Sequence, residues 1–121
     1  GELAAAEAGV SRLMSVAFTD GAVRTRMKTV TRRLGWRFAK AGDTVTLCRK
    51  VMGRKPGEPL VRLAEVEIVD VRREQLAAIE YDDVSREGFP GWSPSQFVHF
   101  FLSHMGGDPR QEITRLEWRY L

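Results

Sequence analysis

Residues 60–71 constrain the fold most, because they read as one long β-strand whose side-chain alternation changes phase part-way along. Val66 and Ile68 fall on one face of such a strand, whereas Val69 and Val71 fall on the other. Since successive side chains of a regular strand point to opposite faces, this pattern requires an irregularity. The sequence therefore predicts a β-bulge or a strong bend near Ile68.

Four further segments are rich in the hydrophobic and β-branched residues that favour strands. They are residues 14–18, 28–33, 44–48 and 112–121. In the last of them, Leu116, Trp118 and Tyr120 alternate with charged residues. That alternation predicts a strand with one buried and one solvent-exposed face.

Residues 93–104 are the clearest predicted helix. Ser93 suits the N-cap, Pro94 suits the first helical position, and Gln96 completes a Ser-x-x-Gln capping box. Shorter helical turns are indicated at residues 75–79 and 82–87. Strands dominate, and these helices fall between the fourth strand and the last. The sequence therefore predicts a mainly β fold with inserted helices (α+β), arranged as a small, mostly antiparallel barrel.

The length and composition indicate one domain. The chain has 121 residues, enough for a single hydrophobic core, which we place in residues 14–121. Residues 1–13 are expected to be a flexible lead-in, either native or added by cloning. No apolar run reaches the roughly 18 residues needed to span a bilayer, and the first residues lack a secretory signal pattern. With a single cysteine, Cys48, the chain is expected to be cytoplasmic and to have no membrane contact.

The charge is distributed unevenly. The net charge is only +3, yet residues 21–57 hold eleven of the 19 Lys and Arg residues and only one of the 16 acidic residues, Asp43. This stretch therefore carries +10 and the rest of the chain −7. A strongly basic segment of this kind favours a nucleic-acid or phosphate partner. The competing interpretation is an ordinary solvated face.

Residues 28–33, Lys-Thr-Val-Thr-Arg-Arg, hold the densest set of groups able to bind an anion. They offer one ammonium group, two hydroxyls and two planar guanidinium groups. Trp36 follows closely and is either a base-stacking platform or a core residue. The residues expected to contact nucleic acid are Arg24, Arg26, Arg32, Arg33, Trp36 and Arg37.

The same stretch resembles the signature of the ASCH domain family, G-x-K-x-x-T-x-R, a branch of the PUA-like superfamily of small β-barrels. Lys28 matches the lysine, Thr31 the threonine and Arg33 the arginine, whereas Arg26 stands where the family has glycine. Other features follow in the family's order, over most of residues 15–121. They are Gly42-Asp43 before a strand, the long strand at 65–71, the acidic stretch 82–89 ending Glu87-Gly88-Phe89, the S-x-x-x-F helix at 93–101 and the final strand at 116–118.

This resemblance implies a function. Family members are thought to bind RNA or nucleotides, and some resemble small amidohydrolases that deacetylate N(4)-acetylcytidine with a lysine, a threonine and a glutamate. By position those catalytic roles fall on Lys28, Thr31 and Glu87. Residues i and i+3 of a regular strand point to opposite faces. For Lys28 and Thr31 to share a site, either the backbone bulges near Thr29 or Lys28 lies in the turn before the strand. The alternative to a catalytic role is a structural ion pair between Lys28 and Glu87.

We therefore expect an RNA- or nucleotide-binding ASCH domain with a basic cleft around residues 28–33. The alternatives are an amidohydrolase acting on N(4)-acetylcytidine-type nucleosides, a ribonuclease, and an adaptor for an acidic protein. No cofactor and no metal are expected, because His99 and His104 do not share a helix face and Cys48 has no partner. The oligomeric state stays open.

Overall fold

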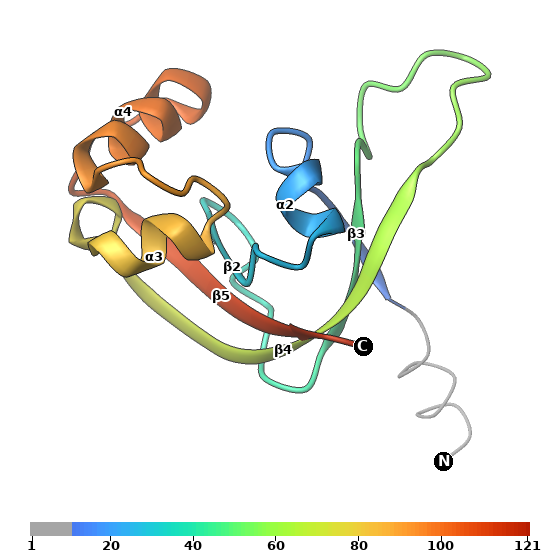
Figure 1. Ribbon diagram of the computed structural model, residues 1–121, viewed down its shortest axis with the longest axis horizontal. Helices are drawn as coiled ribbons and strands as arrows, with labels where there is room; N and C mark the ends of the chain where they lie inside the picture. Colours follow the sequence, from blue (N-terminus) through green and yellow to red (C-terminus); the bar gives the residue numbers. More distant parts are fainter. Residues whose placement is uncertain (1–10) are drawn as a thin grey trace.

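The computed structural model describes residues 11–121, which form one five-stranded sheet with helices packed against it (Figure 1). The sheet has the spatial order β1-β3-β4-β5-β2. The strands are β1 (Arg12–Ser15), β2 (Val30–Arg33), β3 (Thr44–Cys48), β4 (Arg62–Gln75) and β5 (Glu112–Tyr120). The helices are α2 (Asp20–Arg24), α3 (Tyr81–Arg86) and α4 (Pro94–Met105), with a 3₁₀ turn, η1 (Leu76–Ala78).

The sheet curls into a half-barrel. Three of its four strand pairings are antiparallel, and only β1 runs parallel to its neighbour β3. The mainly β fold with inserted helices is therefore confirmed. Since β1 and β2 lie at the two ends of the strand order, the sheet remains open between them.

Strand β4 is the long, bent strand that the sequence predicted. Its register with β5 shifts between Ile68 and Asp70, so the predicted bulge is confirmed. The shift leaves Val66 and Ile68 fully buried while Val69 is 44% exposed. The strand also continues beyond the predicted end at residue 71, as far as Gln75. Polar residues 72–75 gave no hydrophobic signal, but they pair with residues 112–115 at the start of β5.

The boundaries of β1 and β2 differ from the prediction, and both differences shape the site. Strand β1 begins at Arg12, so the last residues of the predicted lead-in belong to the sheet, whereas residues 1–10 lie outside the described part of the chain. Strand β2 begins at Val30 rather than at Lys28. The Lys28 amide instead donates to the Ala22 carbonyl in α2, at 3.1 Å. Lys28 therefore lies in the turn before the strand.

Helix α4 has the predicted N-terminus. The Gln96 amide donates to Ser93 Oγ at 3.1 Å, and the Ser93 amide donates to Gln96 Oε1 at 2.7 Å, which completes the capping box. The predicted turns at 75–79 and 82–87 are η1 and α3. No helix in residues 11–121 is long and apolar enough to cross a membrane.

Two hydrophobic clusters hold these elements together. One lies on the sheet and includes Val23 of α2, Leu47 of β3, Ile68 of β4 and Trp118 of β5. The other joins α4 to η1, α3 and the start of β5, through residues such as Phe97 and Phe101. The candidate site described below draws residues from β2, from α4 and from the segments that flank α2 and α3.

Candidate ligand-binding pocket

A cavity of about 210 Å³ lies where β2, α4 and the chain just after α3 meet. Its polar side includes Lys28, Thr31, Arg32, Arg33 and Glu87. Its apolar side consists of aromatic and other hydrophobic side chains, which are Phe18, Phe89, Phe97, Phe100, Phe101 and Met105. The structure thus brings the three residues proposed from the family resemblance, Lys28, Thr31 and Glu87, to one cavity. Their catalytic role stays a prediction.

Lys28 is buried and is held by one residue. Its ammonium donates to the Glu87 backbone carbonyl at 2.6 Å and to Glu87 Oε1 at 3.1 Å. The side chain is only 4% exposed. Burial lowers the pKa of Lys28, and Arg33 and Arg32 lower it further, while Glu87 raises it without restoring the ordinary value. Two of the three donor positions on Nζ are therefore engaged by Glu87, which leaves the third for a ligand.

The backbone of Lys28 is fixed from the far end of β5. Trp118 Nε1 and Tyr120 Oη both donate to the Lys28 carbonyl, at 3.1 and 2.5 Å. The Thr29 amide donates to the Arg86 carbonyl of α3 at 2.8 Å, so the turn is also tied to the helix that precedes Glu87. The alternation in residues 112–121 predicted Trp118 and Tyr120 only as part of the buried face of a strand. Their NH and OH groups gave no signal of this second role.

Glu87 reaches the cavity because of the glycine that follows it. Gly88 has φ of 106°, a left-handed conformation that a side chain rarely adopts. A Cβ atom there would lie 3.0 Å from Cβ of Ala22 and 3.1 Å from Cγ2 of Thr19. The Glu-Gly pair therefore lets the end of α3 pack closely on α2 and places the carboxylate beside Lys28.

Thr31 and Arg33 point from β2 into the same cavity. Arg33 Nε donates to Thr31 Oγ1 at 3.1 Å, and Arg33 Nη2 donates to the Ser15 carbonyl at 2.7 Å. None of residues 11–121 accepts a hydrogen bond from the Thr31 hydroxyl or forms an ion pair with Arg33. Burial lowers the pKa of Arg33, but a guanidinium stays charged at neutral pH.

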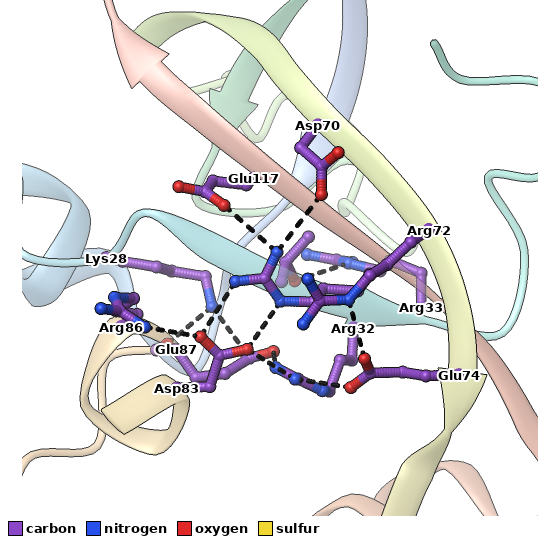
Figure 2. Close-up of polar contacts among 12 residues, drawn as sticks. Lys28, Arg32, Arg33, Asp70, Arg72, Glu74, Asp83, Arg86, Glu87 and Glu117 are labelled. Atoms are coloured by element: carbon purple, nitrogen blue, oxygen red, sulfur yellow. Dashed lines mark hydrogen bonds and ion pairs between the residues drawn. The ribbon is translucent and has the colours of Figure 1, made fainter. Parts of the chain in front are cut away.

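Arg32, its neighbour in sequence, has a different environment (Figure 2). Its guanidinium contacts Asp83 Oδ2 at 2.6 Å, Glu74 Oε2 at 2.9 Å and Glu87 Oε2 at 3.2 Å. The side chain is 1% exposed, and its Nε has no partner among the described residues. Because three carboxylates occupy the guanidinium, the predicted phosphate contact of Arg32 has no geometric support.

The remaining residues predicted to bind nucleic acid lie away from the cavity lining. Arg24 and Arg26 are exposed, and Arg37 pairs with Glu112 at 3.0 Å on the surface. Trp36 packs against the sheet cluster and beside Phe38, with ring centroids 5.1 Å apart. The core alternative for Trp36 therefore fits its packing better than base stacking.

Arg26 occupies a backbone position suited to glycine. Its φ is 63°, and its guanidinium lies over the Tyr120 ring, 5.5 Å from the centroid. The departure from the ASCH signature at this residue thus places a side chain in the left-handed region, where glycine has no steric cost. The turn that delivers Lys28 therefore holds Arg26 in a left-handed conformation.

The apolar side of the cavity was only partly anticipated. The helix pattern placed Phe97, Phe100 and Phe101 on one face of α4, but nothing joined them to Phe18 or Phe89. The Phe100 ring packs edge-on against Phe18, with centroids 5.4 Å apart, and lies 5.0 Å from Phe89. No group of three or more His, Cys, Asp or Glu within residues 11–121 is arranged to hold a metal ion.

Comparisons with known proteins define the fold class. No protein-family model matches the sequence, and no curated protein matches it significantly. A DUF984 protein from Enterococcus faecalis V583 superposes with a TM-score of 0.66 at 12% identity, covering 93% of this chain and 80% of that one. An ASCH domain from Lactobacillus crispatus JV V101 gives 0.64 at 12% identity, with 91% and 79% covered. ASCH from Zymomonas mobilis gives 0.57 at 12% identity, with 90% and 65% covered.

The protein therefore has the fold of the ASCH domains on which it superposes, as the order of its sequence motifs predicted. At 12% identity this likeness describes the backbone only. The function of the cavity depends on its own side chains and not on the fold.

Proposed function

We propose that the cavity binds the base and part of the sugar-phosphate of a nucleotide, either free or within RNA. The proposal rests chiefly on one observation, the meeting of an aromatic wall with a cationic, hydrogen-bonding floor. Aromatic rings stack on bases, and ammonium, guanidinium and hydroxyl groups recognise the polar edge of a base or a phosphate. The volume of about 210 Å³ lies below the usual range of ligand pockets, about 300–1,000 Å³, so it suits one base with part of its sugar-phosphate and not a duplex.

The charges around the cavity favour an anionic ligand. Five cations (Lys28, Arg32, Arg72, Arg86, Arg115) and five carboxylates (Asp70, Glu74, Asp83, Glu87, Glu117) form one ion-paired network. Arg33 adds a cation that no described carboxylate pairs. It is thus the residue best placed to receive a phosphate, with a planar fork suited to bidentate contact. Of the arginines predicted to bind phosphate, Arg33 alone lines the cavity with its charge unpaired.

The test compares cytidine, cytidine 5′-monophosphate and a short single-stranded RNA by isothermal titration calorimetry. We expect the nucleotide to bind more tightly than the nucleoside, and Thr31→Val to lower affinity about tenfold through the loss of one hydrogen bond. Thr29→Val is the matched control, because Thr29 lies in the same stretch but does not line the cavity. Absence of binding by all three ligands, with the protein folded, would contradict the proposal.

The second candidate is an amidohydrolase acting on N(4)-acetylcytidine-type nucleosides. The observation that favours it is the state of Lys28, whose pKa is lowered by burial and whose third Nζ position is open to a ligand. In the neutral amine a lone pair occupies that position, so Lys28 can act as a base. Glu87 holds the amine in place by accepting its two N–H groups.

In that reaction the hydroxyl of Thr31, or a water bound by it, attacks the acetyl carbonyl while Lys28 takes the proton. The bond from the carbonyl carbon to the cytosine amine then breaks, and the amine takes the proton back from Lys28. Water is consumed overall, and cytidine and acetate are released. An acyl-Thr31 intermediate, if formed, is hydrolysed by the water.

Incubation with N(4)-acetylcytidine and, separately, with end-labelled RNA distinguishes the candidates. An amidohydrolase releases cytidine, loses activity by at least about a hundredfold in Lys28→Met, and leaves RNA length unchanged. A ribonuclease shortens the RNA, whereas a binding protein changes neither substrate. An acidic-protein adaptor would show neither binding nor turnover.

A further inference from the structure

Arg32 separates two cavities. On one side lies the pocket described above, and on the other lies a second cavity of about 190 Å³. Charged side chains form almost all of the second cavity, among them Glu74, Asp82, Asp83 and Arg115. Arg32 lines both. A change on the second side can therefore reach the first through this side chain and the residues that hold it.

The second side holds Arg32 firmly (Figure 2). Asp83 is clamped by Arg115, with Nε 2.6 Å from Oδ2 and Nη2 2.9 Å from Oδ1. This two-point contact fixes the plane of the carboxylate. Asp83 Oδ2 then accepts from Arg32 Nη2 at 2.6 Å, and Glu74 accepts from the same nitrogen at 2.9 Å.

On the first side, Arg32 contacts the carboxylate that also binds Lys28. Arg32 Nη1 contacts Glu87 Oε2 at 3.2 Å, while Lys28 Nζ contacts the other oxygen, Oε1, at 3.1 Å. The two cations thus share one carboxylate, one oxygen each. If Arg32 moved, Glu87 could turn both oxygens to Lys28, and if Arg32 lost a partner it would draw more on Glu87.

We propose that Arg32, clamped by Asp83 and Arg115, is a positioning residue for the Lys28–Glu87 pair and sets how much of the Glu87 carboxylate Lys28 receives. As a statement about side-chain positioning it stands on the geometry alone. As a statement about ligand binding it rests on the function proposed above. None of these three residues needs to touch the ligand for the effect to occur.

The charged groups that act on Lys28 come from two places. Arg32 and Arg33 belong to β2, and Glu87 follows α3. The other elements around the pocket present uncharged groups to it, phenylalanines and Met105 from α4 and Ser15 and Thr19 from the segment before α2. Loss of the Asp83 charge removes a partner of Arg32 and frees Arg32 to compete with Lys28 for Glu87. This competition disfavours the protonated form of Lys28.

The experiment follows the titration of Lys28 by NMR of ¹³Cε-labelled lysine, with the signal assigned by its absence in Lys28→Met. Asp83→Asn removes one charge with little change in shape, and we expect the Lys28 midpoint to move to lower pH. Asp82→Asn is the matched control, since Asp82 is the adjacent acid of the same helix turn, lines the same second cavity and makes no contact with Arg32. It should leave the midpoint unchanged.

Affinity for cytidine 5′-monophosphate is measured in parallel, with about a tenfold loss expected in Asp83→Asn and none in Asp82→Asn. If the Lys28 midpoint does not move in Asp83→Asn, or moves equally in both variants, the positioning role is wrong. If it moves as expected but no variant and no wild type binds a nucleotide, the positioning role stands and the proposed function fails.

Should Asp83→Asn fail to fold, Glu74→Gln replaces it, because Glu74 holds the same Arg32 nitrogen but is partly exposed. A smaller shift in the same direction supports the proposal, and an unchanged midpoint overturns it.

Discussion

The two cavities on either side of Arg32 differ in the side chains that line them. Most of the arginines and carboxylates that line the second cavity pair with one another, whereas the first combines an aromatic wall with Lys28, Arg33 and one carboxylate, Glu87. The neighbours Arg32 and Arg33 show the difference most clearly, since one contacts three carboxylates and the other contacts none among the described residues. Paired buried charges constrain side chains, whereas an unpaired one leaves a place for a ligand.

The largest expected effect tests this contrast through stability. Arg32→Met leaves buried carboxylates without their shared cation, which typically costs about 3–5 kcal/mol of the free energy of unfolding. Arg33→Met removes two hydrogen bonds and no ion pair, so it should cost about 1–2 kcal/mol. Urea unfolding followed by circular dichroism measures both. Equal losses of unfolding free energy in the two variants would show that the ion pairs of Arg32 do not distinguish it from Arg33.

The next effect concerns binding. Arg33→Met should weaken cytidine 5′-monophosphate about 10- to 100-fold, because a charge-assisted phosphate contact is lost, and should weaken cytidine much less. It should also reduce the salt dependence of RNA binding by about one phosphate contact. Calorimetry at two salt concentrations checks both. If cytidine and its monophosphate weaken equally, Arg33 is not a phosphate ligand.

The acid stability of the paired side provides a third test. Burial alone would raise the pKa of Asp83, but hydrogen bonds from Arg115 and Arg32 outweigh it and hold the pKa well below its ordinary range. A depressed folded-state pKa contributes stability that is complete above the unfolded value, about 3.9, and is lost as the pH falls through the folded value. The free energy of unfolding should therefore fall steeply below about pH 4 in the wild type and less steeply in Asp83→Asn. Asp82→Asn should retain the wild-type slope in the same denaturant titrations.

The smallest effect concerns the turn that delivers Lys28 to the pocket. Since Arg26 has φ of 63°, Arg26→Gly should be more stable than Arg26→Ala by about 1 kcal/mol, because alanine keeps the left-handed strain. Both variants lose the contact with the Tyr120 ring, so the comparison isolates the backbone. Thermal unfolding of the pair measures the difference. A more stable alanine variant would mean that the turn changes conformation on substitution.

Much of the half-barrel could be predicted from local patterns. The bulge at Ile68, the capping box at Ser93 and the strand Thr44–Cys48 each follow from residues close in sequence, where periodicity and side-chain chemistry act directly. The end of β4 could not be predicted. Its last residues are polar, and they extend the sheet only because β5 lies beside them.

The candidate site was likewise predictable in part from the sequence. The ordered ASCH-like motifs placed Lys28, Thr31 and Glu87 together, although spacing alone left open whether Lys28 lay on the strand. Hydrogen bonds from α2, Trp118 and Tyr120 decided that it lies in the turn. The density of basic residues suggested that Arg32 and Arg33 play the same part. Their separation into a paired and an unpaired arginine depends on Glu74, Asp83 and Glu87, which lie 42, 51 and 55 residues away from Arg32 in the chain.

By itself, the sequence determined which segments form the strands and the capped helix, which fold class they belong to, and that one stretch carries an excess of positive charge. Those properties depend on neighbouring residues and on composition. Only the tertiary structure decided which of those cations are paired with carboxylates. The energy of a buried charge depends on the groups within a few ångströms of it, whatever their place in the chain. In this protein the fold pairs Arg32 with three carboxylates and leaves Arg33 facing the pocket without one among the described residues.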